Sequence, residues 1–228
     1  MPSFGSNSNS NSNSSRNSTQ NSVRIIGGKF RGRRLNFKPI EGLRPSSDRV
    51  RETLFNWLMN DLIDSRGLDL YAGTGVLGLE ALSRGAVEII FLERDKNTAE
   101  NIKKSIQELG LNQGLNQGLN SRAQVKNLDV LFFLDQPRVN HYAQVFDLIF
   151  CDPPFFKNLL LETLDLLIKN HWVGPESLIY LECEPDVKIL ENLSAREKLG
   201  QIKILKQKRT AQVVYSLVRV EAQEYNGE

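Results

Sequence analysis

The chain has 228 residues, of which 40% are hydrophobic, so it is long enough to bury one substantial core. Its apolar runs are far shorter than the roughly 20 residues that a membrane span requires, which excludes a helical integral membrane protein. Its two cysteines, Cys151 and Cys183, form neither a CxxC pair nor a Cys/His cluster. The sequence therefore predicts no metal site and no disulfide framework, and we expect a monomer in the reducing cytoplasm.

The formal net charge of +2 hides an uneven distribution along the chain. Between Val23 and Glu52, nine basic residues stand against three acidic ones, a local charge of +6, so the remainder carries −4. A basic segment on a slightly acidic body is typical of a protein that binds a polyanion, because each neutralised phosphate releases condensed counterions. A solvated charged face is the alternative interpretation.

The first 60 residues divide into three segments. Residues 1–22 are almost entirely Ser and Asn and predict a disordered leader. Residues 23–42 alternate basic and apolar side chains around Gly27, Gly28 and Gly32, which predicts a short basic hairpin. A serine followed by an acid at Asp48 then predicts a helix start, with apolar side chains at helical spacing and a polar side made of Asp48, Arg49, Arg51, Glu52 and Asn56.

From residue 68 the pattern is that of an α/β domain. Short apolar strands alternate with amphipathic helices: strands over 68–72, 87–93, 124–128, 145–152 and 177–183, and helices over 76–83, 96–109, 129–134 and 157–170. This alternation predicts a doubly wound, mostly parallel sheet within a domain over 43–222. The strand-like runs 200–209 and 211–221 predict an antiparallel pair at one edge, which completes seven strands. The Gly/Asn repeat at 110–120 predicts an expanded surface loop, and 223–228 a short tail.

A glycine-rich motif follows the first strand of this domain. Its residues are Asp69, Tyr71, Gly73 and Gly75, and glycines at a strand-to-helix turn let a ligand approach the backbone and the helix N-terminus. Glu93 ends the next strand, where an acid reaches ribose hydroxyls. This pair alone also predicts a dinucleotide-binding oxidoreductase. Asp69 favours a cationic ligand such as S-adenosylmethionine instead, because an acid repels pyrophosphate.

Two further acids follow predicted strands. Asp129 is placed either to meet an adenine amino group or to cap the short helix that it precedes. The run Asp152-Pro153-Pro154-Phe155 follows the fourth strand, and its prolines predict a rigid turn. A carboxylate and an outward carbonyl there can accept both N–H groups of a base amine, while an aromatic ring stacks on the extruded base. The alternative is a plain strand-ending turn with Phe155 in the core.

Four segments together resemble the RsmD-type family of small-subunit ribosomal RNA guanine-N2 methyltransferases. They are RIIGGKFRGRRL (24–35), RPSSDRVRETLFNWL (44–58), DLYAGTGVLGLEALSRG (69–85) and DPPF (152–155). The resemblance extends over nearly all of 24–220. It implies a methyltransferase fold, S-adenosylmethionine as methyl donor, and a guanine N2 of 16S ribosomal RNA as acceptor, of the type that modifies guanine 966. The implied partner is 16S ribosomal RNA within a small-subunit assembly particle.

The resemblance also implies residue roles. It implies that the cofactor is bound by Asp69, Tyr71, Gly73, Gly75, Glu93 and Asp129. It implies that the target base is held by Asp152, Pro153, Pro154 and Phe155. The basic residues expected to meet RNA or to shape the substrate pocket are Arg24, Arg31, Arg33, Arg34, Lys38, Arg44, Arg49 and Arg51. The Ser/Asn leader and the Gly/Asn repeat depart from the family pattern and are expected to be dispensable.

Three alternative functions remain open at this stage. The first is a methyltransferase acting on adenine N6 or protein glutamine, which shares the acid-or-amide-Pro-Pro-aromatic chemistry. The second is a nicotinamide-dependent oxidoreductase, which leaves the Asp152–Phe155 run unexplained. The third is an RNA-binding module without catalysis, which has no need of Asp69, Glu93 and Asp152 together.

Overall fold

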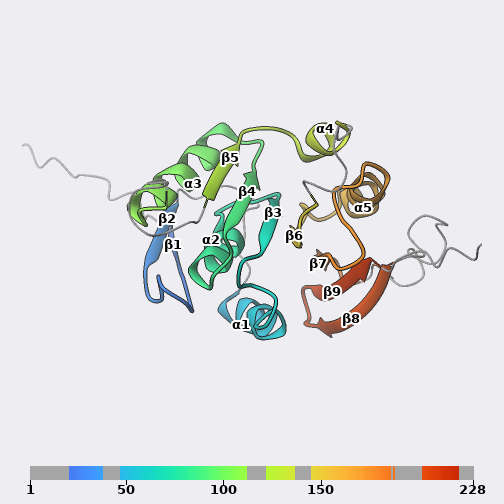
Figure 1. The fold of residues 1–228 in the computed structure, drawn as a ribbon, viewed down its shortest axis with the longest axis horizontal. Helices are drawn as coiled ribbons and strands as arrows, with labels where there is room; N and C mark the ends of the chain where they lie inside the picture. The colour runs from blue at the N-terminus through green and yellow to red at the C-terminus, as the bar shows by residue number, and fades with distance from the viewer. Residues whose placement is uncertain are drawn as a thin grey trace, which may run out of the picture.

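The computed structural model describes residues 21–37, 47–111, 122–136, 145–185, 187 and 202–220. A seven-stranded sheet forms its centre, in the order β5-β4-β3-β6-β7-β9-β8 (Figure 1). Its strands are β3 (Arg66–Leu70), β4 (Glu88–Leu92), β5 (Arg122–Lys126), β6 (Leu148–Cys151), β7 (Leu178–Cys183), β8 (Ile202–Arg209) and β9 (Val214–Val220). The helices are α1 (Asp48–Trp57), α2 (Val76–Ser83), α3 (Lys96–Glu108), α4 (Val130–Leu134) and α5 (Leu159–Lys169). The separate antiparallel pair is β1 (Asn21–Arg24) with β2 (Arg34–Phe37).

The predicted doubly wound sheet is confirmed. Strands β5, β4, β3, β6 and β7 are parallel, and the chain reverses its winding direction between β3 and β6. The final two strands form the expected antiparallel pair. The strand that runs opposite to the parallel strands is not the edge strand but its neighbour inside the sheet. Strand β9 runs antiparallel between β7 and β8, so β8 is the edge strand.

Side chains alternate between two cores, one on each face of the sheet. Leu148 and Phe150 of β6 pack with α1, α2 and α3, whereas Ile149 and Cys151 pack with α4 and α5. Strands buried on both faces have continuous apolar sequences, which is why β6 reads as the run LIFC. Within the described ranges, no helix has the length and apolar content that crossing a membrane would require.

The basic hairpin is docked rigidly on helix α2. The Lys29 N–H donates to the Ser83 carbonyl (2.7 Å), and the Ser83 hydroxyl donates to the Gly27 carbonyl (2.6 Å). Gly28 has φ of +71°, and a Cβ there would lie 1.9 Å from the Ser83 carbonyl oxygen. The close approach therefore requires glycine. Figure 1 shows β1 and β2 beside α3, and Arg33 donates to the carbonyl of Glu108 at the end of that helix (2.9 Å).

A buried carboxylate, Glu80, holds the hairpin to the domain. It is fully buried in α2 and accepts the N–H groups of Ile26 (2.8 Å) and Gly27 (2.7 Å). The Arg84 guanidinium donates to it (2.8 Å), and that of Arg51 lies 3.5 Å away. Two backbone donors and two cations thus surround one acid, which offsets the cost of its desolvation.

Arg51 corrects two predictions. We expected it on the polar side of its helix and among the RNA contacts, but its side chain has 0% exposure. It pairs with Asp48 (2.6 Å) and with Glu80 across the α1–α2 interface. The helix start itself is confirmed, because the Ser47 hydroxyl accepts the Val50 N–H. Arg51 is therefore a structural cation, and burial removes it from direct contact with RNA.

The predicted leader ends earlier than we expected. Asn21 and Ser22, assigned to the disordered segment, pair with Phe37 and Asn36 in the hairpin. Several other predictions lie outside the described residues: the leader over 1–20, the repeat over 112–120, the tail over 223–228, and the side chains of Lys38 and Arg44.

Replacing Glu80 with Ala should destabilise the protein by about 3 to 5 kcal/mol, because Arg51 would lose its buried counter-charge and two hairpin N–H groups would lose their acceptor. Glu100→Ala is the matched control, since Glu100 forms an exposed pair with Lys103 and its loss should leave the free energy of unfolding nearly unchanged. Urea unfolding measures both variants. Equal stability of the two variants would refute the role given to Glu80.

Candidate functional site

The functional residues predicted from sequence gather at the carboxyl ends of the parallel strands. Leu70 of β3 pairs with Cys151 of β6, so Tyr71 and Asp152 follow neighbouring positions on adjacent strands about 4.8 Å apart. On the other side of β3, the Ala72 N–H donates to the Leu92 carbonyl (2.9 Å). The glycine loop is thus held between the ends of β4 and β6. This is the crevice at which doubly wound sheets bind ligands.

The glycine loop has the backbone conformation that its residues permit. Tyr71, Gly73 and Gly75 all have positive φ, at 57°, 53° and 72°. Gly75 precedes α2 without a side-chain cap, so the helix N-terminus offers N–H groups and a positive dipole end. Gly78 has a different purpose, because a Cβ there would lie 2.4 Å from the Phe91 ring. That glycine lets α2 pack closely on β4.

Two acidic side chains accept hydrogen bonds from backbone N–H groups of the glycine loop and of the helix that follows it. Asp69 is buried and accepts the Gly78 N–H (2.9 Å). Glu93 is half-buried and accepts the N–H groups of Gly73 (2.9 Å) and Asp95 (2.8 Å). Burial raises the pKa of Asp69 to about 8, partly offset by the Gly78 bond, and the nearby Glu93 adds to the rise. Burial also raises the pKa of Glu93. Two neighbouring desolvated carboxylates favour a cationic ligand.

Asp129 and Tyr71 have structural partners besides any ligand. Asp129 caps α4 by accepting the N–H groups of Leu131 (2.9 Å) and Phe132 (3.2 Å), which is the second of the two roles that the sequence left open. Its side chain is exposed at the end of β5. The Tyr71 hydroxyl is hydrogen-bonded to the Thr163 hydroxyl of α5 (2.7 Å). Tyr71 therefore fixes the loop against the opposite face of the sheet, and its role toward a ligand stays a prediction.

The Asp152–Phe155 run follows β6 directly, with no regular structure over Asp152, Pro153 and Pro154 and a turn that begins at Phe155. Asp152 is half-exposed, Pro153 is buried, Pro154 is exposed and Phe155 is half-buried. Burial raises the pKa of Tyr180 well above its ordinary range, and Glu182, Asp152 and Tyr215 add to the effect. Asp152 thus lies beside the glycine loop.

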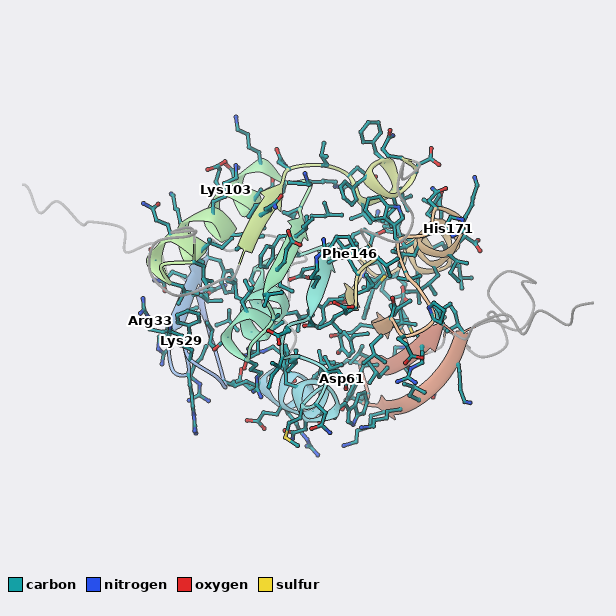
Figure 2. The ribbon with its side chains drawn as sticks, viewed as in Figure 1. Lys29, Arg33, Asp61, Lys103, Phe146 and His171 are labelled. Carbon is teal, nitrogen blue, oxygen red and sulfur yellow. The ribbon has the colours of Figure 1, made fainter. Side chains whose placement is uncertain are left out.

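The predicted RNA-contacting cations have different environments. Arg24 is exposed and pairs with Asp48 (3.3 Å), whereas Arg34 donates to the Ser22 hydroxyl (3.1 Å). Arg31 and Arg49 are exposed. Figure 2 shows Lys29 and Arg33 at the outer edge of the hairpin. The hairpin turn lies against the C-terminal half of α2, away from the glycine loop. Its cations therefore lie on one outer side of the domain and not at the candidate site.

Sequence reasoning missed three residues at or near this site. Glu80 is a lone acid in the otherwise apolar helix VLGLEALS, which was a readable signal for a buried pair. Glu182 is 5% exposed in β7 and accepts the Tyr180 hydroxyl (2.7 Å), and it too stands alone in an apolar run. Phe156 is 85% exposed, which no periodicity indicated. Among the described residues, no group of His, Cys, Asp and Glu could hold a metal ion.

Comparisons with known proteins agree with this architecture. The family profile described as "Conserved hypothetical protein 95" matches residues 23–219. Ribosomal RNA small subunit methyltransferase D of Haemophilus influenzae is 44% identical over 86% of this chain and 92% of its own length. The Escherichia coli protein of the same name is 40% identical, over 88% and 91%. A solved Escherichia coli structure, provisionally described as a methyltransferase, has a TM-score of 0.72 and 38% identity, covering 89% of this chain and 100% of its own.

The raised pKa of Asp69 has a measurable consequence for stability. Its folded value of about 8 exceeds the ordinary 3.8, so unfolding releases a proton between these values and stability falls as pH rises through them. Asp69→Asn should lose this dependence while its amide oxygen still accepts the Gly78 N–H. Urea unfolding should therefore show that raising the pH from about 5 to about 8 lowers the free energy of unfolding of the native chain more than that of the variant. Identical pH dependence would mean that Asp69 is ionised in the fold.

Proposed function

Because the chain belongs to the Conserved hypothetical protein 95 family, the RsmD-type family, we propose that it methylates the N2 amino group of a guanine in 16S ribosomal RNA. S-adenosylmethionine is the methyl donor of this RNA methyltransferase. One observation carries the proposal: the Leu70–Cys151 pairing puts the Asp152–Phe155 turn directly beside the glycine loop. A base-binding turn and a nucleoside-binding loop thus share one crevice.

The residues at the loop fit this donor. S-adenosylmethionine combines a cationic amino-acid end, ribose hydroxyls and an adenine amino group. Asp69 with the α2 N-terminus suits the zwitterionic end, and Glu93 suits the ribose. Asp129 uses one carboxylate oxygen, Oδ1, for both capping bonds, and we assign the adenine amine to its other oxygen. These acidic side chains would repel a pyrophosphate.

The chemistry requires an amine to be held in line with an electrophilic carbon. S-adenosylmethionine would supply that carbon as the methyl group of its sulfonium, so that the N–CH3 bond forms as the S–CH3 bond breaks, S-adenosylhomocysteine leaves and the amine loses one proton. The guanine N2 lone pair is delocalised into the ring, and acceptors that bind both N–H groups favour the geometry in which it attacks. We assign these acceptors to the Asp152 carboxylate and the Pro153 carbonyl, with Phe155 stacking on the extruded base. Positioning supplies most of the acceleration.

The basic N-terminal segment fits a large RNA substrate. Arg31, Arg34 and Arg49 are exposed, and the hairpin that carries two of them is docked rigidly on α2 and α3. We propose that these cations contact ribosomal RNA at a distance from the target base, within a small-subunit assembly particle. A reducing cytoplasm is the proposed location, and both cysteines are buried and free.

The cofactor class can be tested by thermal shift. S-adenosylhomocysteine should stabilise the protein by about 2.7 kcal/mol at a concentration 100-fold above its Kd, because a ligand of the native state stabilises it by mass action. Nicotinamide dinucleotides should produce no shift. Glu93→Ala should lower the affinity for S-adenosylhomocysteine, whereas the exposed-acid control Glu100→Ala should not. A shift with nicotinamide dinucleotides alone would favour the oxidoreductase.

The reaction can be tested with 16S ribosomal RNA and with partly assembled small subunits, using radiolabelled S-adenosylmethionine. The modified base is then mapped, and we expect N2-methylguanine, of the position-966 type. Asp152→Ala should lower the rate by roughly 100-fold or more while leaving the S-adenosylhomocysteine shift intact. The control is Asp135→Ala, an exposed acid at the end of α4. Methylated adenine, or full activity of Asp152→Ala, would contradict the proposal.

A further inference from the structure

The carboxyl-terminal hairpin of the sheet carries a second concentration of positive charge. Residues 202–220 contain five cations and no acid. Three of the five, Lys206, Lys208 and Arg209, are exposed in the second half of β8. Within the described part of the chain, none of these three is ion-paired. Figure 1 places β8 on the opposite side of the molecule from the β1–β2 hairpin.

A β-bulge determines which way these side chains point. Before it, Ile202 and Ile204 pair with Val220 and Val218, which belong to the core on the α5 face. The register then skips Leu205, so that Lys206 and Lys208 pair with Leu217 and Tyr215. Those two residues belong to the core on the opposite, α1 face. Directly paired residues share a face of the sheet, so the bulge turns both lysines to the α1 face.

That face also carries the predicted catalytic acid. Across the sheet, Cys151 pairs with Leu181, which pairs with Ser216, which pairs with Gln207. Asp152 follows this row on β6, and Lys208 follows it on β8. Three interstrand steps of about 4.8 Å separate the two strands, roughly 14 Å in all. Phe150, two residues earlier on β6, belongs to the core on the α1 face, and the alternation of the strand continued to Asp152 puts this residue on the same face.

An exposed aromatic ring follows the Asp152–Phe155 run along the chain. Phe156 is 85% exposed, directly after the Asp152–Phe155 turn. Its φ of +60° is unusual for a residue other than glycine, and its N–H donates to Glu184, just beyond the end of β7. Its ring stands at 90° to that of Phe155, with centroids 6.3 Å apart. A large exposed ring, on a backbone held by Glu184 and next in the chain to the proposed base-binding run, is placed to stack on a second base.

We propose that Lys206, Lys208 and Phe156 form a second RNA-binding surface, which holds the single strand that flanks the extruded guanine. This proposal rests on the proposed function and adds to it the path of the substrate beyond the target base. The lysines would neutralise backbone phosphates, and Phe156 would stack on a base adjacent to the target. A strand whose target base is extruded has unstacked neighbours, which is the form that aromatic platforms bind.

Lysines on an edge strand also protect a sheet from pairing with another sheet, and this purpose alone would account for charge on β8. Such protection does not depend on the face to which the charges point. The bulge nevertheless aims Lys206 and Lys208 at the face of Asp152, and a guard against edge pairing has no use for Phe156. The combination favours RNA.

The test measures the salt dependence of binding to deproteinised 16S ribosomal RNA in the presence of S-adenosylhomocysteine. The double variant Lys206→Gln/Lys208→Gln should make the slope of log K against log salt shallower by about 1.4, at about 0.7 per lost contact with a single strand. The matched control is Arg209→Gln/Lys169→Gln. Arg209 pairs with Val214 on the α5 face and Lys169 is exposed on α5, so the control removes equal charge from the other face.

Phe156 is tested by affinity at fixed salt. Phe156→Ala should bind the same RNA roughly 5- to 100-fold more weakly with an unchanged salt slope, since stacking involves no phosphate. Phe156→Trp should retain affinity, whereas Phe156→Leu should not, because leucine keeps apolar area and lacks a π-face. All three variants accept the same backbone strain. Equal binding by the Ala and Trp variants would eliminate the stacking role.

The outcomes separate this inference from the proposed function. If the wild type methylates 16S ribosomal RNA and the β8 variant keeps its full salt slope, the surface is refuted and the function stands. A slope that falls equally in the control pair would also overturn the surface, because it would reflect net charge alone. If the wild type methylates no RNA but the β8 variant alone loses salt dependence, the function fails and the surface stands.

Discussion

The parallel pairing of β3 with β6 is the constraint on which the site depends. The chain leaves β3 toward β4 and β5 on one side, then returns to place β6 on the other side. The two connections diverge, so the ends of β3 and β6 open a crevice instead of being covered by a shared crossover. The glycine loop enters this crevice from β3, and the Asp-Pro-Pro turn enters it from β6. Their chemistry is joined only because two central strands are neighbours.

Three buried or half-buried carboxylates of this fold, Glu80, Asp69 and Glu93, accept hydrogen bonds from backbone N–H groups. Glu80 accepts two N–H groups of the hairpin, Asp69 accepts one from α2, and Glu93 accepts one from Gly73 of the glycine loop and one from Asp95. These acids differ in whether a cation lies close to the carboxylate. Arg51 and Arg84 surround Glu80, whereas burial raises the pKa of Asp69 and of Glu93. An acid with sufficient partners stabilises the fold, and an acid that lacks them is suited to a cationic ligand.

The arrangement of charge suggests how a small enzyme handles a large substrate. The basic hairpin is attached to the ends of α2 and α3, and the basic strand β8 lies at the opposite edge of the sheet. The crevice lies between them. Contacts on both sides of a reacting centre can position an RNA without adding bulk at the centre itself. Under the proposed function, phosphate contacts of this kind would provide affinity and register, and the residues between them would read the base.

Much of this protein could be predicted from sequence, because local patterns report local structure. The helices over 76–83 and 96–108, the hairpin, and the acids that end β4 and β6 follow from hydrophobic period, glycine positions and strand-ending motifs. Tertiary structure alone decided the rest. Arg51 looked like a surface cation until Glu80, 29 positions later in the chain, was packed against it. The bulge in β8 likewise needs β9 to define its register, since the facing of a strand is a property of the pair.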